Sequence, residues 1–208
     1  MTTPTFNLHS VRQKMQSYSS NWQIYVLLLL FLVGMTVGSF ASKGDGTLVT
    51  NKIADFYMNY LKVKPTISGL SVFFNTFLLA SSAIIVTYFI GLCAVGIPFV
   101  AFVPVLAGGF IGIISGYIYE NYMLKGLGYC AIIIFPAAII AVAAILFACK
   151  ESFLMSVTML NLLSQRRSQP LESFKNYSLK FVIYIAITAA GALTETIMTR
   201  LFIGLFAF

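Results

Sequence analysis

Charged residues are scarce in this sequence. Asp, Glu, Lys and Arg together make up only 9% of its 208 residues, whereas they account for about a quarter of a soluble domain. Apolar residues make up 59%, and the mean hydropathy is +0.91. These values exclude an ordinary soluble domain. Because a helix needs roughly 20 apolar residues to cross the hydrocarbon core of a bilayer, the composition predicts a chain made mostly of membrane-spanning helices.

Histidine and cysteine are scarce too. The one histidine, His9, lies in a polar N-terminal segment, and Cys93, Cys130 and Cys149 have no metal-ligand spacing. The cysteines fall inside or at the edges of apolar runs, where a thiol behaves as a small apolar side chain. The sequence therefore predicts no metal site, no cofactor and no enzyme chemistry.

The net charge is positive. There are 13 Lys and Arg against 6 Asp and Glu, which gives +7. A nucleic-acid-binding protein gathers such charges on one face, but here they are scattered over the ends of apolar runs. That arrangement is typical of basic residues that contact anionic lipid headgroups and set the orientation in the membrane. Membrane lipid is therefore a predicted partner, and nucleic acid is not.

The apolar runs predict an all-α transmembrane bundle of about five spans, formed by residues 22–208 as a single domain. Residues 1–21 are polar and form a predicted cytoplasmic segment, and Trp22 marks the interface where the first span starts. Residues 72–119 contain no Lys, Arg, Asp or Glu, so this run is long enough for two spans. The predicted spans are residues 23–40, 72–90, 99–119, 127–149 and 180–200.

Glycine, proline and charged residues place the connections between the spans. Gly91 and Pro98 predict a tight turn after the second span, and residues 120–126 predict a short loop after the third. Residues 41–71 carry several charges and predict a water-exposed loop with a short amphipathic helix on the membrane surface. Residues 164–178 predict a basic loop before the last span.

Lys150 and Glu151 mark the end of the fourth span. Beyond them, apolar and polar residues fall on separate helical faces, which predicts that the helix continues along the interface. An alternative boundary places Lys150 inside the membrane, at a cost of about 2.5–3.5 kcal/mol on insertion scales.

The Lys and Arg count favours one orientation. With a cytoplasmic N-terminus, seven of these residues lie on the cytoplasmic side and five on the other, and cytoplasmic loops normally carry the excess. The sequence therefore predicts a cell-membrane protein with a cytoplasmic N-terminus and an extracytoplasmic C-terminus. The seven are Arg12, Lys14, Lys150, Arg166, Arg167, Lys175 and Lys180, and the five are Lys43, Lys52, Lys62, Lys64 and Lys125.

Small residues suggest where helices pack. Gly108, Gly112 and Gly116 form a GxxxGxxxG ladder in the third span, and small residues at this spacing let two helix backbones approach closely. A stripe of alanines on the fourth span, which includes Ala137 and Ala141, is the expected partner. The sequence does not distinguish packing within the chain from docking of another protein.

Three polar residues are predicted to lie within spans. Asn75 is expected to form an interhelical hydrogen bond or to lie near the interface. Glu195 and Arg200 are five residues apart, which turns them roughly 140° from each other on a helix. Arg200 is expected to anchor the far interface, while Glu195 binds Arg200 loosely, a neighbouring helix, or a proton.

An ordered set of motifs resembles one family. It comprises Ile90-Gly91 with Gly96-Ile97-Pro98, the glycine ladder, Lys125-Gly126, and Phe135-Pro136 followed by an aliphatic run. Taken together over roughly residues 70–163, these motifs resemble the stage II sporulation protein M family. The sequence departs from that family where Thr76 and Ala137-Ala138 replace polar residues that the wider family often has.

The resemblance implies an inner-membrane protein of an endospore-forming bacterium that acts during engulfment of the forespore. In that family, it implies a scaffold that anchors the peptidoglycan-remodelling stage II sporulation proteins D and P. The alternative hypothesis is a permease or transporter subunit, in which Glu195 lines a path.

Overall fold

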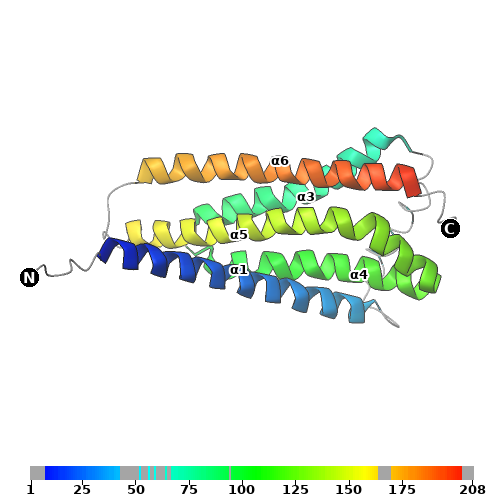
Figure 1. Ribbon diagram of the computed structural model, residues 1–208, viewed down its shortest axis with the longest axis horizontal. Helices are drawn as coiled ribbons and strands as arrows, with labels where there is room; N and C mark the ends of the chain where they lie inside the picture. The colour runs from blue at the N-terminus through cyan, green and yellow to red at the C-terminus, as the bar shows by residue number, and fades with distance from the viewer. Residues whose placement is uncertain are drawn as a thin grey trace, which may run out of the picture.

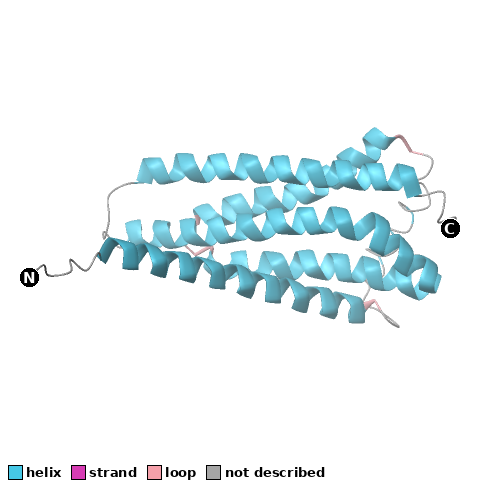
Figure 2. Cartoon of the chain, in the orientation of Figure 1, coloured by secondary structure: helices cyan, strands magenta, loops and turns pink. Residues whose placement is uncertain are grey.

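Five long helices and one π-helical turn make up the computed structural model, which describes residues 8–42, 52, 56, 59, 64, 67–93, 95–163 and 170–202. The elements are α1 (Leu8–Ala41), α3 (Gly69–Leu92), α4 (Ile97–Tyr129), η1 (Cys130–Ile134), α5 (Phe135–Leu163) and α6 (Pro170–Phe202). The helices lie along one common direction (Figure 1), and a short turn after Leu92 leads from α3 into α4 (Figure 2). The predicted all-α fold is confirmed.

The helices are long and apolar enough to cross a bilayer. Such stretches are Trp22–Ala41, Gly69–Leu92, Ile97–Leu160 and Phe174–Phe202. The third has 64 residues, about three times what one crossing needs, and it reverses direction near Met123 (Figure 1). The described chain therefore passes along the bundle five times, as predicted for a multi-pass membrane protein.

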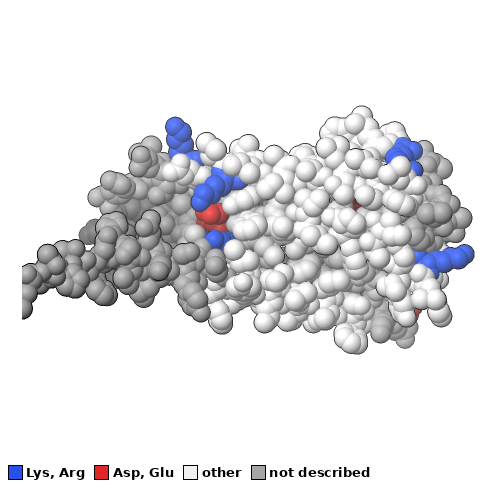
Figure 3. Space-filling view, in the orientation of Figure 1, with Lys and Arg blue, Asp and Glu red and all other residues white. Residues whose placement is uncertain are grey.

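The outside of the bundle is apolar, in contrast to the outside of a soluble protein. In the face that Figure 3 shows, a largely uncharged band lies between two ends where basic and acidic side chains gather. An apolar exterior of this extent is suited to hydrocarbon rather than water. Large apolar side chains exposed on the helices include Leu29, Val37, Leu78, Phe89, Phe102, Leu106, Ile139 and Val182.

The helices extend beyond the predicted spans. Residues 8–21, predicted as a lead before the membrane, belong to α1, and the start of α6 at Pro170 turns most of the predicted basic loop into helix. Helical hydrogen bonds form in water as well as in lipid, so a helix ends at a breaker residue rather than at the membrane boundary. Pro170 is such a boundary, because proline suits the first position of a helix.

The connection after α4 is tighter than the predicted loop at residues 120–126. Helical geometry is interrupted at Met123 alone, where φ is 48° and ψ is −124°. This is close to the first central position of a type II′ turn, which glycine normally occupies. Beyond the turn the chain folds back, and Gly126 packs directly against Ile118.

One core joins all five helices. α1 packs mainly on α4, while α5 packs on both α3 and α6. The buried side chains that form this core are Leu27 and Phe31 of α1, Ile84 of α3, Val100 of α4, Ala144, Ala148 and Cys149 of α5, and Tyr177 and Phe181 of α6.

The turn at Met123 generates a stability prediction. A non-glycine residue at positive φ costs on the order of 1–3 kcal/mol, and the Met123 side chain is 71% exposed, so little packing is lost by removing it. Met123→Gly should therefore stabilise the protein by about 1 kcal/mol, after the entropy of glycine in the unfolded chain is subtracted. The measurement is the melting temperature of the purified protein in detergent.

The control is Met123→Ala, which removes the same side chain but retains a Cβ. It should not raise the melting temperature. Equal melting temperatures for the glycine and alanine variants would show that the backbone at this turn is not strained.

Candidate functional site

The glycine ladder of α4 lies against the backbone of α1. A Cβ added at Gly108 would lie 2.9 Å from the Met35 nitrogen, and one at Gly112 would lie 2.9 Å from the Ser39 nitrogen. At Gly116, the added Cβ would collide with the Ser42 hydroxyl oxygen and lie 3.1 Å from the Ser39 carbonyl oxygen. Only glycine lets the two helices come this close. Since both sets of residue numbers rise together along the contact, α1 and α4 run parallel.

α1 contributes glycines of its own to this interface. A Cβ added at Gly34 would lie 2.9 Å from the Cα of Val105, and one at Gly38 would lie 2.9 Å from the Cα of Gly109. The sequence analysis missed this half of the contact, although Gly34 and Gly38 have the same four-residue spacing as the ladder. The α1–α4 contact is therefore one glycine face packed on another.

The partner of the ladder differs from the expected one, the alanine stripe of α5. Ala137 is buried beside Gly191 of α6, where its carbonyl oxygen would lie 3.4 Å from an added Cβ. Ala141 is partly buried, and Ala144 is in the common core. An alanine face holds two backbones a methyl group further apart than a glycine face does. The closest approach is therefore made by the two helices that both present glycine.

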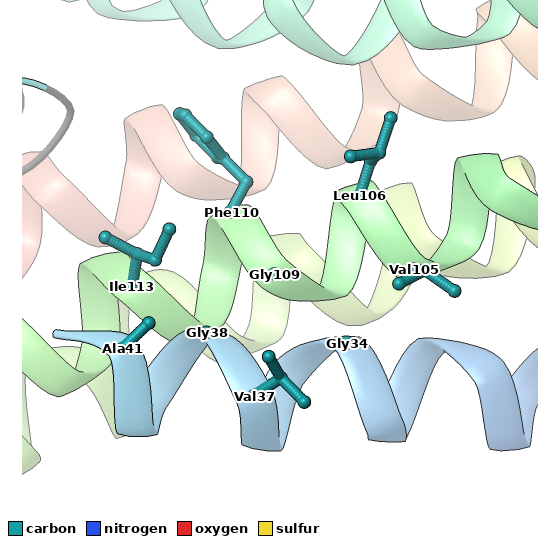
Figure 4. A pocket seen from close by; sticks show the side chains of 9 residues that line it. All are labelled: Gly34, Val37, Gly38, Ala41, Val105, Leu106, Gly109, Phe110 and Ile113. Atoms are coloured by element: carbon teal, nitrogen blue, oxygen red, sulfur yellow. The ribbon is translucent and has the colours of Figure 1, made fainter. Parts of the chain in front are cut away.

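A groove runs beside the glycine interface on the surface of the bundle (Figure 4). Its volume is about 430 Å³, and Val37 and Leu106 on its walls are 62% and 58% exposed. Its position on the apolar exterior makes it a feature of the hydrocarbon-facing surface. The lining residues are Gly34, Val37, Gly38 and Ala41 of α1 and Val105, Leu106, Gly109, Phe110 and Ile113 of α4.

Hydroxyl groups of α5 and α6 bind the last turns of α3. Ser152 donates a hydrogen bond to the carbonyl oxygen of Thr87 at 2.8 Å, and Tyr177 donates one to that of Tyr88 at 2.9 Å. Ser156 donates to the carbonyl oxygen of Gly91 at 3.2 Å. The last four carbonyls of a helix lack partners within it, and that of Gly91 is one of them, so Ser156 caps α3. Ser152 and Tyr177 add hydrogen bonds to carbonyls about one turn earlier.

These contacts correct the predicted course of the chain after Lys150. The helix does not lie along the interface there, because Ser152 and Ser156 are both completely buried within the bundle. Ser152 also leaves no space for a side chain at Gly91, because an added Cβ there would lie 2.8 Å from the Ser152 hydroxyl oxygen.

Asn75 does not form the expected interhelical hydrogen bond with any described residue. It is exposed on α3, six residues after the helix begins, which is about 9 Å along the axis and agrees with the alternative of a position near the interface. Another residue of α3, Ser81, does make an interhelical polar contact, because its hydroxyl lies 3.4 Å from that of Thr188 on α6.

Glu195 is paired with a lysine that precedes α3. Lys64 Nζ lies 2.6 Å from Glu195 Oε1, and the two side chains are 0% and 12% exposed. Lys64 also donates a hydrogen bond of 3.5 Å to the hydroxyl of Tyr129, and its Nζ lies 6.0 Å from the centroid of that ring. The end of α4, the last quarter of α6 and Lys64 before α3 therefore meet at one buried ion pair.

Arg200 binds the same segment further out on α6. Its guanidinium donates a hydrogen bond to the carbonyl oxygen of Ile67 at 2.8 Å. Glu195 was expected to bind Arg200 loosely, a neighbouring helix, or a proton, but its carboxylate binds Lys64, a turn residue before α3. The prediction that Lys64 lies in a water-exposed loop is wrong, because its side chain is buried and its ammonium group binds the carboxylate of Glu195.

A π-helical turn follows the aromatic member of this cluster directly. η1 begins one residue after Tyr129, and the N–H of Phe135 donates back to the carbonyl oxygen of Cys130. Pro136 comes next, and a wider turn accommodates a proline, which has no N–H and crowds the turn before it. Such π-helical turns are rare and are frequent at functional sites, which makes the Lys64, Glu195 and Tyr129 cluster the candidate site.

The fold and this cluster define a multi-pass helical membrane protein held together by close glycine packing and a buried ion pair. The family model described as stage II sporulation protein M matches residues 27–200. The chain therefore belongs to the stage II sporulation protein M family, as the resemblance implied. Neither a curated protein nor a solved structure matches it.

The glycine interface predicts a difference between two neighbouring substitutions. Gly112→Ala forces the α1 and α4 backbones apart and should destabilise the protein by about 1–3 kcal/mol. Gly109→Ala is the matched control, because an added Cβ there has its nearest neighbour, the Gly34 carbonyl oxygen, at 3.7 Å. It should leave stability unchanged or raise it slightly through helix propensity. The measurement is the melting temperature of each variant in detergent. Equal melting temperatures for Gly112→Ala and Gly109→Ala would contradict close packing of α1 on Gly112.

The buried ion pair predicts a double-mutant effect. Glu195→Gln removes the carboxylate that the buried Lys64 ammonium contacts at 2.6 Å, which should cost about 3–5 kcal/mol of stability. The double variant Lys64→Met with Glu195→Met removes both charges and should cost markedly less, since apolar side chains often replace a buried pair at little loss. Additive losses in thermal stability would show that the two residues do not interact.

Proposed function

We propose that this protein is a membrane scaffold that anchors peptidoglycan-remodelling proteins during engulfment of the forespore. By family resemblance, the anchored proteins are stage II sporulation proteins D and P. The role is structural, and the bundle itself carries out no chemistry.

The observation that carries this proposal is the attachment of the segment before α3 to the end of α6. Lys64 is bound by Glu195 at 2.6 Å, and the carbonyl oxygen of Ile67 is bound by Arg200 at 2.8 Å. Lys64 and Ile67 are thereby each held at a defined place on the bundle. A scaffold needs such a surface, because a partner binds more tightly to a segment that is already ordered.

The same contacts weigh against the permease hypothesis. Glu195 was the acidic residue expected to line a path, and its carboxylate is engaged by Lys64. The groove of Figure 4 is lined by apolar residues and glycines, which offer no ligands for an ion or a polar substrate.

Orientation is part of the proposal. With the N-terminus in the cytoplasm, the attached connection faces the cell wall side, where hydrolases act. A cysteine at Phe56, which is 77% exposed, should react with an impermeant thiol reagent in intact protoplasts of a variant whose native cysteines are replaced. A cysteine at Ser168, in the connection between α5 and α6, should not. The reverse labelling pattern would invert the orientation.

The function is tested by deleting the gene in a sporulating host. Engulfment should stall and fluorescently tagged hydrolases should lose their septal position, and the wild-type gene should restore both. Glu195→Gln should restore them less well than the double Met variant, in the order of their stabilities. Normal engulfment in the deletion strain, without a paralogue, would contradict the proposal.

A further inference from the structure

The groove between α1 and α4 lies within one half of the hydrocarbon core. On α1 it extends from Gly34 to Ala41, which is about 10 Å along the helix axis. Ala41 ends the apolar stretch that starts at Trp22, and polar and charged residues follow it in the sequence. The Ala41 end of the groove therefore lies at the edge of the hydrocarbon. Because the core is about 30 Å thick, the groove remains on one side of the membrane midplane.

The groove is long and narrow, and it runs along both helices (Figure 4). On α4 it extends from Val105 to Ile113, about 12 Å along the axis. Its volume of about 430 Å³ divided by this length gives a mean cross-section of about 36 Å². An α-helix with its side chains is about 10–12 Å wide, a cross-section of at least about 80 Å², so a helix does not fit inside. A single hydrocarbon chain, one methylene wide, can lie in the groove lengthwise.

The lining excludes water as the occupant. Every side chain on the walls of the groove is apolar, including the exposed Val37 and Leu106. A bound water molecule needs two to four polar partners, and the backbone carbonyls within a helix already accept helical hydrogen bonds. An empty groove is also unfavourable, because its walls lose van der Waals contacts. Lipid hydrocarbon, which surrounds the bundle at this depth, is therefore what fills it.

Gly109 keeps the floor of the groove open. A Cβ added at Gly109 would have its nearest neighbour, the Gly34 carbonyl oxygen, at 3.7 Å, which is an ordinary van der Waals contact. At Gly112, in contrast, an added Cβ would collide with the backbone of α1. The packing of α1 on α4 therefore requires glycine at position 112 but not at position 109, where a side chain would instead occupy the groove (Figure 4).

We propose that the groove between α1 and α4 binds one acyl chain of a membrane lipid from the leaflet at the Ala41 end. The chain enters beside Ala41, runs parallel to the two helices over Gly109, and reaches Gly34 and Val105 with its deeper carbons. The site does not depend on the proposed scaffold function. It is also independent of the orientation, because the Ala41 end defines the leaflet.

The test uses the full-length protein in nanodiscs that contain a phosphatidylcholine with a photoreactive diazirine on one acyl chain. After irradiation, lipid-modified peptides are identified by mass spectrometry. Residues 34–41 and 105–113 should be labelled roughly fivefold more than residues 78–89 of α3, because a chain in the groove gains on the order of ten van der Waals contacts. A diazirine near the carboxyl end of the chain should label close to Ala41, and one deeper in the chain should label close to Gly34.

Gly109→Leu fills the groove and should lower its labelling to the level of α3. Gly109→Ala fills it only in part and should lower the labelling by roughly twofold. The matched control is Ala186→Leu, which adds a leucine at an exposed position of α6 and should leave labelling of the groove unchanged. Melting temperatures show whether each variant is folded, and Gly109→Ala decides the outcome if Gly109→Leu is not.

Three results would overturn the proposal. The first is labelling of the groove no stronger than that of α3, and the second is unchanged labelling in the folded Gly109 variants. The third concerns a protein as the occupant. If a photoreactive residue at Leu106 is crosslinked in cells to a protein of discrete mass rather than to lipid, the groove is a docking site for another protein.

Discussion

The parallel contact between α1 and α4 is the packing on which the rest of the bundle depends. In a bilayer, lipid tails are as apolar as leucine, so helices associate through close contact rather than through the exclusion of water. Gly34 and Gly38 on α1 lie against the backbone of Val105 and Gly109 on α4. Gly108 and Gly112 on α4 in turn lie against the backbone of Met35 and Ser39 on α1, so the two backbones are in direct contact along much of the span. This contact fixes α4, and the turn at its end then sets where α5 runs.

The other helices are joined by polar contacts at the two ends of the bundle. At one end, hydroxyl groups of α5 and α6 donate hydrogen bonds to carbonyl oxygens in the last two turns of α3. At the other end, the ion pair of Lys64 and Glu195 ties α6 to the segment that precedes α3. Buried polar groups stabilise a structure only when all are satisfied, so each end accepts one arrangement of its helices.

Close glycine packing along the span and polar contacts at both ends are consistent with a protein that holds others in place. Its family, the stage II sporulation protein M family, is shown by a match over residues 27–200, and the proposed scaffold role draws on the ordered attachment next to α3. Glycine packing brings α1 and α4 into close contact, and the ion pair attaches Lys64 to α6. Both features favour a rigid platform over a moving gate.

The sequence by itself determined the fold class and the number of passages, because run length and the lack of charge are local properties that a bilayer converts directly into spans. It also located the turn at residues 93–96 and the glycine ladder. Only the tertiary structure decided that the ladder meets α1, that Lys64 is buried against Glu195, and that Ser81 rather than Asn75 makes a polar contact from α3 to α6. These depend on which helices become neighbours. Which helices pack together depends on how well the surfaces of all five fit one another, and the sequence of one helix does not contain that information.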